Sequence, residues 1–159
     1  MKSRIKPVGD VPVSDVEIRT ATAEDIPCII ELDEKATGQA KSQYWRELFG
    51  HFAQPAGNGR AFLVAEQQGR VVGFITGEIR AFEFGSEPCG WVFAVNVDPE
   101  IRVHNVGTRL FETLCETFKR AGVEKVRTML DRDNDLVLAF FRSLGMMAGP
   151  FIQLEKDLD

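Results

Sequence analysis

The order of apolar and polar positions along the chain predicts an alternation of strands and helices that begins near residue 16. Apolar–polar alternation, or a short apolar run between turn signals, indicates a strand, and apolar residues three and four apart indicate a helix. The expected strands are residues 16–19, 61–67, 70–84, 91–97, 124–131 and 150–158. The expected helices are residues 21–34, 42–52, 106–121 and a last one between 134 and 145.

Local signals place the ends of these helices. Pro27 has no N–H and should therefore fall within the first turn of its helix. Gly122 is a natural C-terminal cap for the long helix, and Asp133 or Asn134 should cap the last one. The apolar side of the long helix consists of Val106, Leu110, Phe111, Leu114, Cys115 and Phe118.

The length of 159 residues fits one domain, and no repeat, linker or low-complexity block divides the sequence. We therefore expect residues 15–159 to form a single α+β domain. Residues 1–14 contain two prolines and a glycine and show no apolar periodicity. They are predicted to be a flexible N-terminal arm.

Charge and composition exclude several classes of function. The formal net charge is −5, from 19 basic and 24 acidic residues, which argues against electrostatic binding to nucleic acid or to an anionic membrane. No apolar run approaches the roughly 18 residues of a spanning helix, and no secretory signal begins the chain, so a cytoplasmic location is expected. Three scattered cysteines and two histidines do not match a zinc site, and no metal is expected.

The most informative segment is the strand at 91–97 followed by a short loop and the helix that starts at Val106. A helix that starts just after a strand leaves its first N–H groups aimed at one point, and its dipole favours negative charge there. This arrangement suits a phosphate. Gly107 stands where backbone must approach such a ligand, and Arg102 stands at the loop entrance. The sequence has neither a dinucleotide-binding GxGxxG turn nor a GxxxxGK[ST] loop.

The order of elements resembles the GNAT superfamily of acyl-CoA N-acyltransferases from about Val16 to Leu158. The loop Arg102-Val-His-Asn-Val-Gly107 is similar to the family pattern Gln/Arg-x-x-Gly-x-Gly/Ala. Asn105 replaces the first glycine, a mild change because asparagine tolerates positive φ. Downstream, Asn134, Phe140 and Gly145 match a second family signature. The resemblance implies a GNAT-like fold, with a mixed, mostly antiparallel sheet, splayed central strands and flanking helices.

The resemblance also implies a cofactor, acetyl-CoA, with CoA as the product. Its pyrophosphate would rest on the loop amides, and its pantetheine arm would run beside the strand at 91–97 as an extra strand. The slot for the thioester would lie where this strand and the strand at 124–131 part. The cofactor-binding residues implied in this way are Val95, Val97, Arg102, Val103, His104, Asn105, Val106, Gly107, Thr108, Asn134 and Phe141.

The residues for proton transfer depart from the family pattern. Trp91 stands where many members have a glutamate base, and Phe141 stands where the usual tyrosine acid would be. The substitute bases are Glu78, which we prefer because its strand adjoins the slot, and three further carboxylates. Those three are Glu83, Glu87 and Asp131. Bulk water could protonate the thiolate instead.

The function that these features predict is transfer of an acetyl group to a primary amine of a small molecule or protein by direct attack in a ternary complex. The alternative is a non-catalytic acyl-CoA sensor or regulatory module, because the binding loop is present while the usual proton-handling residues are not. Aromatic residues of the second helix and the hairpin would line the acceptor site or, equally, a homodimer interface. They are Tyr44, Trp45, Phe49, Phe82 and Phe84.

Overall fold

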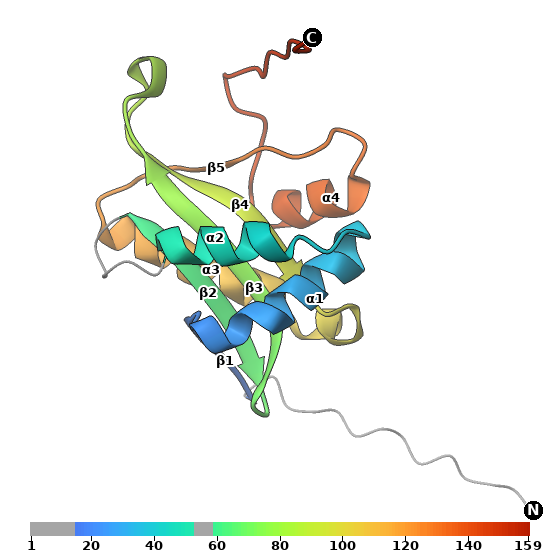
Figure 1. Cartoon of the computed structure of the whole chain (residues 1–159). Coiled ribbons are helices and arrows are strands. Elements are labelled where there is room, and N and C mark those ends of the chain that lie inside the picture. Colours follow the sequence, from blue (N-terminus) through green and yellow to red (C-terminus); the bar gives the residue numbers. More distant parts are fainter. Residues whose placement is uncertain (1–14, 53–58) are drawn as a thin grey trace, which may run out of the picture. The chain divides into compact units, whose positions relative to one another are not determined.

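The computed structural model describes residues 15–52 and 59–159, so the predicted flexible arm at residues 1–14 lies outside the described residues (Figure 1). The chain divides into two compact units, Met1–Thr128 and Met129–Asp159. The first contains the sheet and three helices, and the second contains one helix. Among the described residues, no helix combines the length and the apolar character that crossing a bilayer requires.

The first unit is built on one five-stranded sheet whose strands follow chain order. The strands are β1 (Val16–Thr20), β2 (Arg60–Gln67), β3 (Arg70–Arg80), β4 (Cys89–Val97) and β5 (Val126–Thr128). Neighbours are antiparallel from β1 to β4, and β5 pairs parallel to β4. The predicted mixed, mostly antiparallel sheet is therefore confirmed. The turn between β2 and β3 is at Gln68 and Gly69, both with positive φ, as the hairpin pattern predicts.

Helices cover both faces of this sheet (Figure 1). α1 (Ile26–Thr37) and α2 (Ser42–Phe52) cover one face, and α3 (Val106–Arg120) covers the other. Short 3-10 turns precede α1, join β3 to β4 and join β4 to α3; they are η2 (Ala23–Asp25), η3 (Glu83–Gly85) and η4 (Pro99–His104). Pro27 lies in the first turn of α1, as predicted. The predicted apolar stripe of α3 is buried except for Cys115, which is half-buried.

Apolar side chains of α1 and α2 form a core cluster with β2 and β3. Its largest members are Trp45, Phe52, Phe62 and Phe74, and the Trp45 ring packs edge-on against the Phe74 ring with centroids 5.1 Å apart. The Trp45 indole N–H donates to the buried Asp33 carboxylate at 2.8 Å, so the polar edge of this ring is satisfied inside the core. Lys41 forms an ion pair with the same oxygen at 2.9 Å, which joins the segment between α1 and α2 to the core.

On the other face, α3 and the neighbouring strand crowd two glycines of the sheet, so that a larger residue at either position requires a shift of its surroundings. A Cβ at Gly90 would lie 2.3 Å from the Phe118 ring, and one at Gly77 would lie 2.5 Å from the Trp91 carbonyl oxygen. The close approach seats Phe118, which is buried, directly against the backbone of β3 and β4.

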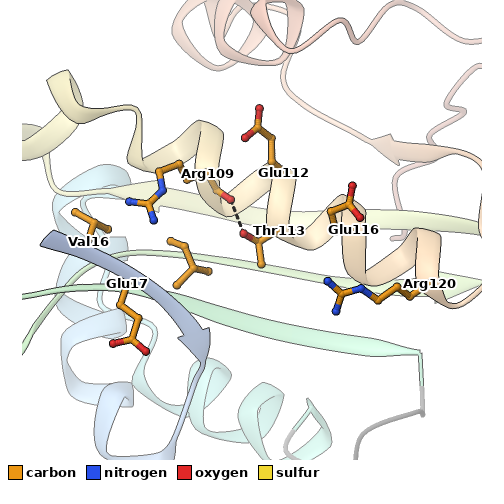
Figure 2. Close-up of a pocket in the computed structure, with 8 residues that line it drawn as sticks. Val16, Glu17, Arg109, Glu112, Thr113, Glu116 and Arg120 are labelled. Carbon is orange, nitrogen blue, oxygen red and sulfur yellow. Dashed lines mark hydrogen bonds between the residues drawn. The ribbon is translucent and has the colours of Figure 1, made fainter. Parts of the chain in front are cut away.

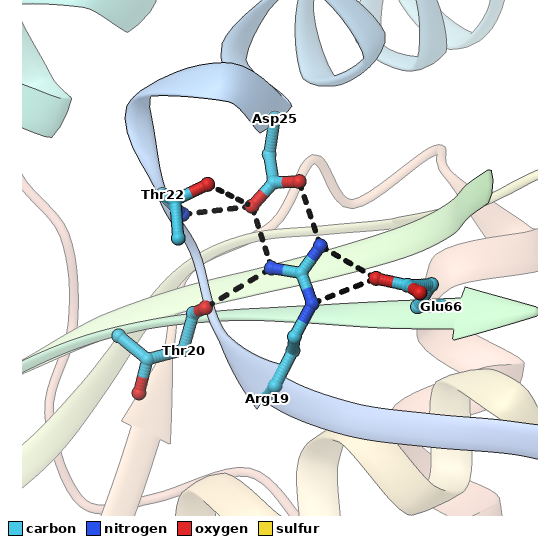
Figure 3. Close-up of polar contacts among 5 residues, drawn as sticks. All are labelled: Arg19, Thr20, Thr22, Asp25 and Glu66. Carbon is cyan, nitrogen blue, oxygen red and sulfur yellow. Dashed lines mark hydrogen bonds and ion pairs between the residues drawn. The ribbon is translucent and has the colours of Figure 1, made fainter. Parts of the chain in front are cut away.

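An ion-paired corner joins β1 to the start of α1 (Figure 3). The Arg19 guanidinium donates to both oxygens of Asp25, at 2.7 and 2.8 Å, and to Glu66 on β2 at 2.8 Å. Asp25 also accepts from the Thr22 N–H at 2.7 Å. The hydrogen bonds from Arg19 hold the pKa of the buried Asp25 below its usual range, and the same contacts raise the pKa of Arg19.

The second unit contains α4 (Asp135–Ser143), and Asn134 caps it by accepting from the Val137 N–H at 3.2 Å. The predicted strand at 150–158 is wrong, because residues 151–159 have no regular secondary structure. Its apolar residues Phe151, Ile152 and Leu154 are all exposed, so no face of this segment is buried as a strand requires.

Candidate active site

The site begins at an irregularity in β4. The register between β3 and β4 shifts between Thr76 and Gly77, which lie opposite Ala94 and Val92, so Phe93 is the extra residue of a β-bulge. A bulge bends its strand and redirects the side chains beside it, and bulges are over-represented next to active sites. The sequence pattern does not predict this bulge, because one extra residue in an otherwise apolar strand leaves no signal in it.

β5 pairs with only the first part of β4. The parallel pairs are Gly90 with Val126, Trp91 with Arg127 and Val92 with Thr128. Among the described residues of the Met1–Thr128 unit, no strand pairs with the outer edge of β4 from Phe93 to Val97. At about 3.3 Å per residue this edge is about 16 Å long. It is the parting of strands that the GNAT resemblance predicts, and it includes Val95 and Val97.

A buried carboxylate fixes the turn at the end of this edge. Asp98 is 1% exposed, and its Oδ1 accepts from the Glu100 N–H at 3.1 Å, which caps η4. Its Oδ2 pairs with Arg70 at 3.2 Å, and its own N–H donates to the Val72 carbonyl oxygen at 2.8 Å. Asp98 therefore ties the start of the loop to β3. The sequence signal that could have found it is an aspartate directly before a proline at the end of a strand.

The loop itself has the backbone that the motif predicts. Residues Pro99–His104 form η4, and Asn105, with φ of 56°, takes the left-handed conformation expected where the family has its first glycine. α3 starts at the next residue, so the predicted loop residues 102–108 run directly into its first turn. Gly107 is the second residue of α3 and is half-buried.

The first turn of α3 is suited to an anion. Asn105 makes no side-chain cap hydrogen bond to it, and it contains no acidic side chain. The N–H groups at this end are consequently not claimed by a capping side chain, and the helix dipole favours a negative charge there. An open strand edge that leads to an uncapped helix start fits a long cofactor that ends in phosphate groups.

Glu78 lies on β3, directly opposite Trp91 of β4 and Arg60 of β2. Its carboxylate is one quarter exposed, and its two oxygens pair with different guanidiniums, Oε1 with Arg80 at 3.3 Å and Oε2 with Arg60 at 3.6 Å. The other proposed bases, Glu83, Glu87 and Asp131, are exposed. Glu78 is thus the only one of the four that is partly enclosed and held in place by charged neighbours.

The five aromatic residues predicted to line an acceptor site or a homodimer interface divide into two groups. Trp45 is buried in the core, and Phe49 is partly buried and packs against that core. Tyr44 is half-exposed, and Phe82 and Phe84 project into solvent from the connection between β3 and β4. The residues that sequence reasoning missed are Arg80 and Phe93, which pack together close to Glu78.

A separate shallow groove lies between β1 and α3 (Figure 2). It is lined by Val16, Glu17, Ile18, Arg109, Glu112, Thr113, Glu116 and Arg120. The charges along it have mixed sign, and none of the residues predicted for the cofactor or for catalysis lines it. We therefore place the candidate site along β4 rather than in this groove.

Two predicted cofactor contacts belong to the second unit. Asn134 is the cap of α4, and Phe141 is the buried residue of that helix. The cap uses the side-chain oxygen of Asn134. The role of both residues toward a cofactor stays a prediction.

The fold is that of the acyl-CoA-binding class of acyltransferases, with a strand that parts from its neighbour and then leads into an uncapped helix start. The profile of the acetyltransferase (GNAT) family matches residues 26–146. The chain belongs to this family, whose enzymes use acetyl-CoA as the acetyl donor.

Individual relatives agree with this assignment. The mycothiol acetyltransferase of Saccharomonospora viridis is 29% identical over 118 residues, which cover 72% of this chain and 35% of that protein. This chain thus spans about a third of the length of the curated relatives it matches.

Solved structures share the fold. An aminoglycoside N-acetyltransferase in complex with CoA superposes with a TM-score of 0.76 at 15% identity, over 96% of this chain and 99% of that one. Glucosamine-6-phosphate N-acetyltransferase from Arabidopsis thaliana gives a TM-score of 0.69 at 23% identity, over 91% of this chain and 99% of the other. These structures confirm the predicted α+β GNAT fold.

Proposed function

We propose that this chain transfers the acetyl group of acetyl-CoA to a primary amine by direct attack in a ternary complex. The observation that carries the proposal is the continuous path from the bulge at Phe93, along the open edge of β4, to the uncapped first turn of α3. Acetyl-CoA supplies the activated acetyl thioester. The chain supplies the surface that binds and orients it.

In this proposal, different residues bind different parts of the cofactor. The pyrophosphate binds to backbone N–H groups of the loop and of the first turn of α3. These N–H groups belong to Arg102, Val103, His104, Asn105, Val106, Gly107 and Thr108. The backbone of Val95 and Val97 pairs with the pantetheine arm, in the manner of strand addition to an open sheet edge. In this proposal, backbone amides at the bulge donate to the thioester oxygen, whose charge develops during attack. Asn134 and Phe141 contact the arm from α4.

Proton transfer is assigned to Glu78 and to water. An amine with a pKa near 10 must lose a proton before it attacks, and Glu78 is the partly enclosed carboxylate next to Trp91. We propose that it accepts this proton through one water molecule. Phe141 cannot donate a proton, so the leaving thiolate would be protonated by water.

The acceptor is proposed to be a small molecule, and a protein amine is the alternative. The relatives named mycothiol acetyltransferases match this chain over a third of their length, which supports acetyl transfer as the chemistry and leaves the acceptor to be found by assay. A cytoplasmic location and a homodimer remain predictions of the sequence.

One observation favours a second function, a non-catalytic acyl-CoA sensor. Trp91 and Phe141 occupy the two positions where the family most often has its base and its acid. A sensor would bind acetyl-CoA and CoA but would release no thiol with any amine.

The first test is calorimetric titration of the chain with acetyl-CoA, together with the variant Gly107→Val. We expect micromolar binding by the unchanged chain and at least about tenfold weaker binding by the variant, because a branched side chain would block the approach of the pyrophosphate to the backbone. Unchanged affinity in a folded variant would mean that the loop does not bind the phosphates.

Thiol release with a panel of amines then separates an enzyme from a sensor. In this assay Glu78→Gln should lower kcat and leave the affinity for acetyl-CoA unchanged, because the residue lies outside the cofactor path. An equal kcat would remove Glu78 from the proton transfer. No thiol release with any amine, despite tight binding of acetyl-CoA, would favour the sensor.

A further inference from the structure

A cluster of aromatic rings and guanidiniums lies on the sheet face opposite α3, beside the bulge. We call Arg60, Glu78, Arg80, Trp91 and Phe93 the aromatic–guanidinium cluster. Glu78 is the register partner of both Arg60 and Trp91, so these three side chains share a face. The Phe93 ring packs edge-on against Phe52 of α2 with centroids 6.4 Å apart, which places the cluster on the α2 side.

Arg80 is the centre of this cluster. Its guanidinium carbon lies 4.8 Å from the centroid of the Trp91 ring and 4.9 Å from that of Phe93. Its Nε is 3.3 Å from Oε1 of Glu78 and 3.9 Å from Oε1 of Glu83. Both carboxylates therefore face the same nitrogen. The rings and these acids hold the guanidinium in one orientation before any ligand arrives.

The two terminal amino groups of Arg80 donate no hydrogen bond to any described residue. The nitrogen nearest to both carboxylates is Nε, and the side chain is one third exposed. A guanidinium whose outer edge is open presents two parallel N–H donors, the geometry that binds both oxygens of a carboxylate or phosphate. Because the side chain is already oriented, little conformational freedom is lost on binding.

The donor pair of Arg80 lies beside the bulge in β4, where the acetyl transfer is proposed to take place. Trp91 lies in the stretch of β4 that still pairs with β5, and Phe93 is the bulge where β4 has left β5. If acetyl-CoA binds as proposed above, its thioester ends at this point of β4. An amine that attacks there would have its neighbouring group within reach of Arg80.

We propose that Arg80 binds an oxyanion of the acceptor, so that the acceptor is a primary amine that also carries a carboxylate or a phosphate. This inference rests on the proposed function, because it takes the bulge as the place of transfer. Glu78 acts in it as a positioning residue toward Arg80, in addition to its proposed part in proton transfer.

The test compares amines that differ only in the anionic group, in the thiol-release assay. The carboxylate pair is 4-aminobutyrate and n-butylamine, and the phosphate pair is phosphoethanolamine and ethanolamine. We expect kcat/KM to be about tenfold or more higher for the anionic member of at least one pair, and which pair shows it identifies the oxyanion. Arg80→Gln should reduce this preference to within about twofold. Arg80→Lys should retain only part of the preference, because lysine keeps the positive charge but lacks the two parallel N–H donors of a guanidinium.

The control variant is Arg46→Gln, which removes the same charge from an exposed position on α2. It should leave the preference intact, which would exclude a bulk electrostatic effect. Equal kcat/KM for both members of both pairs, or a preference that survives in Arg80→Gln, would overturn the proposal.

A second measurement does not need acetyl-CoA. Because Arg80 lies over Trp91, binding of an oxyanion should change the tryptophan fluorescence in a saturable way with 4-aminobutyrate or phosphoethanolamine and not with the neutral amines. The change should be absent in Arg80→Gln. No change with any anionic amine would count against Arg80 as the binding group, even if the chain binds acetyl-CoA and the proposed function stands. Failure of acetyl-CoA to bind, with the fluorescence change intact, would count only against the proposed function.

Discussion

Arg19 and Arg80 each lie between two carboxylates, yet the two guanidiniums are used in opposite ways. Arg19 engages Asp25, Glu66 and the Thr20 carbonyl oxygen with all three of its nitrogens (Figure 3). Among the described residues, Arg80 donates a hydrogen bond only from Nε, which leaves its terminal amino groups for a ligand. The number of donors already occupied distinguishes a structural arginine from one that can bind a ligand.

At the same scale, the Arg19–Asp25 pair predicts how stability depends on pH. Folding lowers the pKa of Asp25, so the unfolded chain binds the proton of this carboxyl group more tightly than the folded chain does. The contribution of the ion pair to the free energy of unfolding is therefore complete above the unfolded pKa of about 4. It is lost as the pH falls below that value toward the lower folded pKa. Asp25→Asn should cost about 2–3 kcal/mol of unfolding free energy near pH 7 and should flatten the acid limb of the profile.

Urea unfolding at a series of pH values checks this prediction, with Glu24→Gln as the control. Glu24 is the exposed neighbour of Asp25 in η2, so its replacement should change the unfolding free energy little at any pH. An acid limb as steep in Asp25→Asn as in the unchanged chain would assign the pH dependence to other carboxylates.

At the scale of elements, the contact of α3 with the sheet predicts a specific coupling. Gly90→Ala would place a Cβ 2.3 Å from the Phe118 ring and should cost about 1–3 kcal/mol through overpacking. Phe118→Ala alone should cost about 3–5 kcal/mol, because it leaves a cavity. The double variant should be more stable than the sum of the two costs predicts, since each change relieves the other.

Denaturant unfolding of the single and double variants measures this coupling. The matched control is Gly50→Ala on α2, where a Cβ would meet nothing within 4 Å and the helix should gain up to about 1 kcal/mol. Additive costs for Gly90→Ala and Phe118→Ala would show that the helix moves away from the sheet instead.

Elements whose signal lies within one short stretch of sequence were predictable. Features that depend on pairing with a distant segment of the chain were not. The bounds of α2 were predicted from its apolar stripe, and the left-handed Asn105 followed from the loop motif. The strand expected at 150–158 failed because an apolar run specifies a strand only when a neighbour pairs with it. The bulge at Phe93 and the stacking of Arg80 depend on the register of β3 against β4, which no single segment encodes.

At the scale of the whole molecule, the first unit has a sheet with two different edges. The β1 edge is only five residues long and carries Glu17 and Arg19, which discourage pairing with another chain. On the opposite side of the sheet, β5 covers only the first part of β4, and the uncovered stretch from Phe93 to Val97 carries no charged side chain. This chain therefore keeps an uncharged stretch of strand edge at the place where the cofactor is proposed to bind.

This second edge has a consequence for the behaviour of the chain in solution. Without a cofactor, an uncharged strand edge can pair with the same edge of another molecule, and such pairing starts aggregation. We expect light scattering on gentle warming to rise earlier for the chain alone than for the chain saturated with CoA, and to be unaffected by AMP, which lacks the pantetheine arm. Identical scattering with and without bound CoA would show that the edge is not the adhesive surface. A later rise in scattering with CoA would mean that the bound cofactor also keeps its own binding strand from aggregating, in addition to its proposed part in the reaction.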